Sequence, residues 1–148
     1  MRPGRSLESS HVESTFPEMD TSSAVFPTVR EVDGSLCLAY YLPESNDSAV
    51  ILFSDCREWS YGGPNDESLA RRNVWGLNLT FYSFHIVLPA PDESRTEWLA
   101  TFHDGCFRVQ AVDFSVLSER EKGCSPSDAL NKVLGVGDNI VLDESRIE

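Results

Sequence analysis

The sequence lacks the residue patterns that mark the common catalytic and metal-binding motifs. It contains no G-x-S-x-G elbow, no P-loop, no H-E-x-x-H pair and no EF-hand loop. Structural zinc sites need closely spaced ligands, and the cysteines include no C-x-x-C pair. They are Cys37, Cys56, Cys106 and Cys124. The sequence therefore predicts no metal site and no cofactor, and it predicts four free thiols in a reducing compartment.

Long apolar runs and basic residues are also scarce. No apolar segment approaches the roughly 20 residues of a membrane-spanning helix, and the polar residues after Arg5 exclude the apolar region of a signal peptide. The 148 residues include 12 basic and 24 acidic ones, for a net charge of −12. Such a surface repels phosphate backbones and anionic lipids. We therefore expect a cytoplasmic protein that binds neither nucleic acid nor membrane.

The length and composition indicate one domain. A chain of this size can bury one core but is too short for two comfortable domains. Residues 1–23 are rich in Ser and Glu and show almost no periodicity, which predicts a flexible N-terminal tail that stability does not require. Residues 24–148 are predicted to form a single β-rich domain.

Apolar alternation between turn residues predicts five or six strands and two helices. The strands are expected at 36–42, directly after a turn at Asp33-Gly34, and at 49–53, 77–88, 97–102, 107–116 and 139–142. The second of these strands is open to extension through Ser60. A short helix is expected from Asn65 or Asp66 to about Arg72, and a longer one between Ser125 and Gly135. The predicted fold class is α+β, with a mostly antiparallel sheet arranged as a sandwich or a partly open barrel.

A hairpin is predicted between the strands at 97–102 and 107–116. Asp104-Gly105 is a strong signal for a two-residue turn, because both central positions of a type I′ turn require positive φ. On this interpretation Asp104 is mainly structural, and His103 is the last residue of the preceding strand.

Two connecting segments carry residues suited to chemistry. His103 and Asp104 lie at the hairpin, and Asn65, Asp66 and Glu67 lie at the start of the short helix. An imidazole beside carboxylates can perform acid–base work, although carboxylates at a helix start are also explained by the helix dipole. Whether the two segments meet in space is left open by the sequence. The candidate catalytic residues are His103, Asp104, Asp66 and Glu67, and the candidate ligand-binding residues are Asn65, Trp59 and Tyr61.

Two motifs resemble those of a set of uncharacterised bacterial proteins. The first is G-G-P-N-D-E-S-L at 62–69, similar to a G-x-P-N-D-E-x-L stretch of that family. The second is W-L-A-T-F-H-D at 98–104, similar to a hairpin with F-T-F-H-D-S-T-F-E. This chain differs in having Gly105-Cys106 in place of Ser-Thr, and Arg108 in place of an acidic residue. The resemblance implies a bacterial source, with no named activity.

Two hypotheses about function follow. The first is a non-catalytic binding module for a basic protein partner or a small ligand, favoured by the net charge and by the missing catalytic motifs. The alternative is a small enzyme or accessory biosynthetic protein that uses His103 and Asp104 with Asp66 or Glu67.

Overall fold

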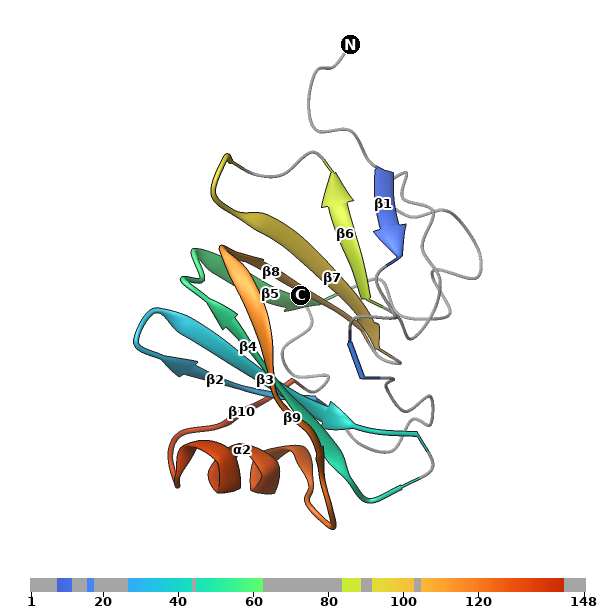
Figure 1. Ribbon diagram of the computed structural model, residues 1–148, viewed down its shortest axis with the longest axis vertical. Helices are drawn as coiled ribbons and strands as arrows, with labels where there is room; N and C mark the ends of the chain where they lie inside the picture. Colours follow the sequence, from blue (N-terminus) through green and yellow to red (C-terminus); the bar gives the residue numbers. More distant parts are fainter. Residues whose placement is uncertain are drawn as a thin grey trace.

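The computed structural model consists of two antiparallel five-stranded sheets packed face to face, with one helix on the outside (Figure 1). It describes residues 8–11, 16–17, 27–43, 45–62, 84–88, 92–102 and 105–142. The predicted α+β class with a mostly antiparallel sheet is confirmed, and the sheets do not close into a barrel. The short helix predicted over 65–72 and the strand residues 77–83 lie outside the described residues.

Sheet A has the strand order β1-β6-β7-β8-β5, and every neighbouring pair is antiparallel. Its strands are β1 (Glu8–His11), β5 (Glu58–Gly62), β6 (Phe84–Leu88), β7 (Thr96–Phe102) and β8 (Gly105–Ala111). Sheet B has the order β10-β2-β3-β4-β9 and is also antiparallel throughout. Its strands are β2 (Thr28–Val32), β3 (Ser35–Tyr41), β4 (Ser48–Ser54), β9 (Asp113–Glu121) and β10 (Ile140–Val141).

The two sheets are joined at one corner, where two paired strands both pass from sheet B to sheet A. β4 ends at Ser54, and the chain continues as β5 after Asp55, whose φ of 52° turns the backbone. The chain paired with it crosses between the same two sheets at Val112, which lies between β8 of sheet A and β9 of sheet B. The sequence-based extension of one strand through Ser60 is therefore wrong. The chain turns at Asp55 into a separate strand of the other sheet, where β5 pairs with β8.

Aromatic side chains fill the space between the sheets. Phe53, Phe84 and Phe107 are buried, and the ring of Phe16 stacks on Phe84 with centroids 4.1 Å apart and on Phe114 at 4.3 Å. Because Phe84 belongs to sheet A and Phe114 to sheet B, Phe16 contacts both layers. Pro17 is fixed as well, since its carbonyl oxygen accepts a hydrogen bond of 2.7 Å from the Tyr40 hydroxyl.

These contacts correct the prediction of a flexible tail at two places. Glu8–His11 form strand β1 and pair with β6, and Phe16 is buried in the core. The composition of residues 1–23 is polar on average, but a single aromatic ring can bury enough apolar surface to fix its own position in the core. The division of the chain at residue 24 therefore does not separate these residues from the domain.

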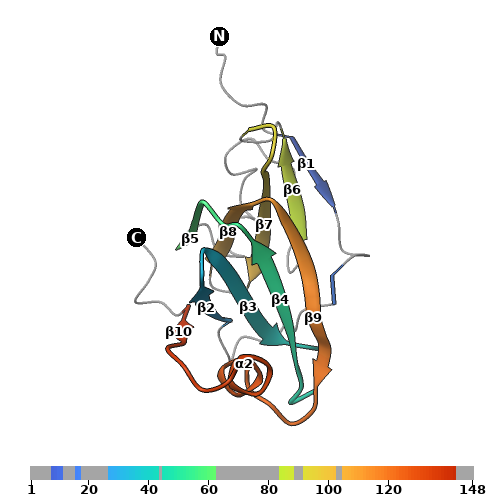
Figure 2. The ribbon, with the colours of Figure 1, turned by 60° about the vertical axis from the view of Figure 1, so that its left-hand side comes forward.

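Helix α2 (Pro126–Leu134) covers the outer face of sheet B (Figure 2). The predicted signals hold: the Ser125 hydroxyl accepts from the Asp128 N–H, Pro126 begins the helix, and Gly135 ends it with a φ of 90°. Ala129 and Leu130 are buried against three sheet residues. These are Cys37, Ala39 and Val50. No helix within the described residues has the length and apolar character needed to span a membrane.

Arg30 of β2 ties the segment after α2 to sheet B. It is 8% exposed and donates three hydrogen bonds of 2.8 Å to the Asn139 and Asn131 side chains and to the carbonyl of Gly135. A Cβ on Gly137 would lie 2.9 Å from the guanidinium carbon, so glycine allows the close approach. This cluster positions β10 beside β2.

Replacing Phe16 by alanine should lower the free energy of unfolding by about 3 kcal/mol, because it leaves a cavity between the two layers. Urea denaturation followed by tryptophan fluorescence measures the change. Leu117→Ala is the matched control, since Leu117 is 40% exposed on β9 and its truncation should cost much less. Equal stabilities of Phe16→Ala and the unmodified chain would contradict the anchoring of residue 16.

Candidate functional site

The candidate site lies at β5, the strand at one edge of sheet A. Two backbone hydrogen bonds hold the chain where it enters β5: Cys56 N–H donates to Gly34 O at 2.7 Å, and Arg57 N–H donates to Gln110 O at 2.9 Å. The first of these bonds brings the β2–β3 turn against the corner. That turn is the predicted Asp33-Gly34 turn, with φ values of 47° and 82°.

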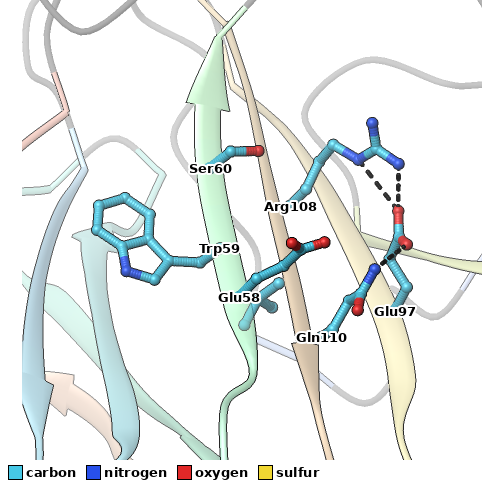
Figure 3. A pocket seen from close by; sticks show the side chains of 7 residues that line it. Glu58, Trp59, Ser60, Glu97, Arg108 and Gln110 are labelled. Atoms are coloured by element: carbon cyan, nitrogen blue, oxygen red, sulfur yellow. Dashed lines mark hydrogen bonds and ion pairs between the residues drawn. The ribbon is translucent and has the colours of Figure 1, made fainter. Parts of the chain in front are cut away.

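A polar hollow of about 260 Å³ opens on the outer face of sheet A (Figure 3). Side chains alternate between the two faces of the sheet, so Trp98 and Val109 face the core while their polar neighbours face outward and line the hollow. Figure 3 shows Glu58 and Ser60 on one side of β5, beside Arg108, Gln110 and Glu97 of the next two strands. The lining consists of Glu58, Trp59, Ser60, Glu97, Arg108, Val109 and Gln110.

The carboxylate of Glu97 is the centre of this hollow and is only 1% exposed. Its Oε2 accepts from Arg108 Nε at 3.0 Å and from Arg108 Nη2 at 2.5 Å, while its Oε1 accepts from Gln110 Nε2 at 3.0 Å. Glu97 and Gln110 are direct partners across β7 and β8. A buried carboxylate needs such charged and polar donors, because desolvation would otherwise destabilise the fold.

A second hollow of about 300 Å³ lies on the other side of β5, between the β2–β3 turn and the corner. Trp59 points into this side, opposite to Ser60 and Arg108 (Figure 3). Its indole Nε1 donates a hydrogen bond of 3.1 Å to Glu31 Oε2. The lining consists of Glu31, Gly34, Ser35, Leu36, Cys56, Arg57, Glu58 and Trp59. Glu58 and Trp59 therefore line both hollows.

The charges around the second hollow are unbalanced. Arg57 is engaged by Asp92 at 3.1 Å, and Arg95 is engaged by Asp55 at 3.3 Å and by Asp92 at 3.7 Å. Glu31 and Glu58 have no ion pair with any residue in the described part of the chain.

The pKa of the Cys56 thiol responds first to burial and then to these charges. Burial raises the pKa of Cys56, and the negative charge of Glu31 raises it further against the opposing charge of Arg95. The hollow is therefore electronegative and can accept a cationic group.

Most of the predicted site residues lie outside the described residues. These are His103, Asp104, Asn65, Asp66 and Glu67. Gly62 of the first motif is the Cα partner of Cys106, which lies two residues after the second motif and pairs on its other side with Thr101 of that motif.

The two remaining predicted ligand-binding residues, Trp59 and Tyr61, have different positions. Tyr61 is 6% exposed and belongs to the core between the sheets, whereas Trp59 lines both hollows. Sequence reasoning overlooked Glu31, Glu97 and Arg108. The signal for the last two was present, since each alternates with core residues in an otherwise apolar strand.

The predicted turn at Asp104-Gly105 is wrong by one residue. Phe102 and Gly105 are Cα partners, so Gly105 begins β8 and residues 103 and 104 are the two that connect the strands. His103 and Asp104 themselves lie outside the described residues. The observed register places Gln110 opposite Glu97, whereas a turn centred on Asp104-Gly105 would have moved Gln110 away from this carboxylate.

The described residues offer no activated cysteine nucleophile and no cluster of metal ligands. Burial raises the pKa of Cys106 to about 12 and that of Cys37 to about 11, which disfavours the nucleophilic thiolate at neutral pH. All four cysteines are free thiols, as predicted. Among the described side chains no cluster of three His, Cys, Asp or Glu could hold a metal ion.

Comparisons of the chain with protein-family models, with curated proteins and with solved structures give no match. The resemblance to uncharacterised bacterial proteins therefore stays a prediction.

The folded protein should react with a thiol reagent in two groups at about pH 8. Cys37 and Cys106 should be protected, because they are buried and their raised pKa values keep them protonated, while Cys56 and Cys124 are partly exposed. Absorbance after addition of an aromatic disulfide measures the reaction, and denaturation should release all four thiols. A Cys106→Ala variant should leave the fast phase unchanged. Rapid loss of the Cys106 thiol in the folded chain would contradict this assignment.

Replacing Glu97 by alanine should destabilise the fold by about 2 kcal/mol, because Arg108 and Gln110 lose the carboxylate that accepts their hydrogen bonds. The figure is below that for a fully buried pair, since the Arg108 side chain is 39% exposed. Urea denaturation provides the measurement. Glu119→Ala on exposed β9 is the control and should change stability by less than about 0.5 kcal/mol. A Glu97→Ala chain as stable as the control would show that the network contributes little.

Proposed function

We propose that the protein is a non-catalytic binding module for a basic protein partner, with the electronegative hollow beside Trp59 as its binding site. The observation that carries the proposal is two carboxylates without an ion pair in the described part of the chain. Glu31 accepts from the Trp59 indole, and Glu58, on the opposite side of β5 from Trp59, lines both hollows. We further propose that it acts in the cytoplasm of a bacterium, in keeping with its sequence motifs and its arginine-rich basic residues.

The geometry suits a lysine or arginine side chain. Carboxylates form charge-assisted hydrogen bonds with ammonium or guanidinium groups, and an indole face attracts a cation within about 6 Å of the ring centroid. Leu36 and Cys56 supply an apolar wall for the aliphatic part of such a side chain.

The net charge supports the same partner class. A charge of −12 raises the association rate with basic proteins by long-range attraction and repels acidic ones. This contribution does not depend on one position, so specificity must come from the groups at the hollow. A small cationic ligand would use the same groups, but it would gain less from the field of the whole surface.

The alternative of a small enzyme depends on His103, Asp104, Asp66 and Glu67, all outside the described residues. No contact or distance in the described part of the chain favours it. The binding proposal depends instead on residues whose positions are described.

Replacing both Glu31 and Glu58 by glutamine should weaken binding of a fluorescently labelled octa-lysine peptide about tenfold, which corresponds to about 1.4 kcal/mol. Fluorescence anisotropy at low and at physiological ionic strength measures the dissociation constant. The variant should remain folded, because both side chains are exposed.

The matched control removes the same charge elsewhere. Glu119→Gln with Asp128→Asn changes two exposed acids at the far end of sheet B and at α2, so affinity should fall by much less than tenfold. Equal losses in the two double variants would reduce the proposal to non-specific attraction, and no binding by the unmodified chain would overturn it.

A further inference from the structure

Strand β5 is an edge strand between two hollows. In the order of sheet A it has β8 as its neighbour on one side and no strand of the described sheets on the other. An edge strand presents backbone N–H and C=O groups that can pair with another extended chain. The hollows lie on the two faces of the same short strand, and Glu58 and Trp59 line both of them.

The edges of sheet B are less suited to pairing. β10 has only two residues. β9 is longer, but its pairing with β4 contains two register shifts near Val50, and it carries the exposed charges of Glu119 and Arg120. Register irregularities and charged side chains are features that protect edge strands from further pairing. Of the four edge strands β1, β5, β9 and β10, β5 is the one whose residues line both hollows.

A strand added beside β5 would present its side chains alternately to the two hollows. Successive side chains of a strand point to opposite faces, so residues i and i+2 reach one hollow and residue i+1 reaches the other. The hollow at Glu31, Glu58 and Trp59 is electronegative, and it accepts a cationic side chain. In the outer hollow, which Glu58 also lines, Glu97 and Arg108 offset each other's charge beside Ser60 and Gln110, and this side suits a small hydroxyl or amide side chain.

We infer that the protein binds its basic partner by β-strand addition: an extended segment with alternating cationic and small polar residues pairs with the edge of β5 that no described strand occupies. This inference rests on the proposed function and specifies its partner as a segment of extended chain. Backbone hydrogen bonds supply affinity, and the two hollows select the alternating sequence.

Octapeptides of equal charge, in three designs, test the inference on the full-length protein. The first alternates lysine and threonine, the second has the same composition with four lysines followed by four threonines, and the third is the alternating peptide with N-methyl groups on alternate residues. Two N-methylated versions, offset by one residue, cover both directions in which the amides can face. Anisotropy competition measures all dissociation constants.

Strand addition predicts that the alternating peptide binds about tenfold more tightly than the block peptide, which lacks the side-chain order. It predicts a similar advantage over one of the two N-methylated peptides, which lacks the backbone donors that face β5. It also predicts slower amide hydrogen exchange at the edge of β5 in the complex. Glu31→Gln with Glu58→Gln should remove the preference for the alternating order.

The failures are distinguishable. If all peptides bind equally and all lose affinity in the Glu31→Gln, Glu58→Gln variant, strand addition is overturned while the proposed cation site stands. If affinity follows charge alone and the Glu119→Gln, Asp128→Asn control loses as much, both the inference and the proposed function are overturned.

Discussion

The hydrogen bond from Val112 N–H to Ser54 O, 2.9 Å long, holds the two paired strands together where both leave sheet B and enter sheet A. β4 pairs with β9 in sheet B, and their continuations β5 and β8 pair in sheet A. Because the two chains stay paired as they cross, the two sheets form one folding unit. The same passage leaves β5 at an edge and brings Cys56 against the β2–β3 turn. Both hollows are consequences of this corner.

Local signals in the sequence predicted what is local in the structure. The helix at Pro126–Leu134 was identified from its cap, its first-turn proline and its terminal glycine, and each of these acts through neighbouring backbone groups. The Asp33-Gly34 turn and the apolar strands β3 and β4 follow for the same reason. These features need no knowledge of the rest of the chain.

The errors all involve partners that are distant in the sequence. Phe16 is held by Phe84 and Phe114, and nothing in the polar segment around it identifies those rings. The Asp104-Gly105 dipeptide alone predicted a hairpin register that differs from the observed one. In the observed register Glu97 pairs with Gln110 across β7 and β8. Glu31 was missed for a related reason, since it lies 28 positions from Trp59 and meets it only after the chain has passed the corner.

The Arg30 cluster has a consequence for the order in which the chain is synthesised. β2 emerges from the ribosome early, but the acceptors of its guanidinium come from residues 131–139, and the strand that covers its edge is β10. Until those residues emerge, a nascent sheet B has an uncovered edge at β2 and a cation without its acceptors. Sheet B therefore reaches its final form only after α2 and β10 have left the ribosomal tunnel.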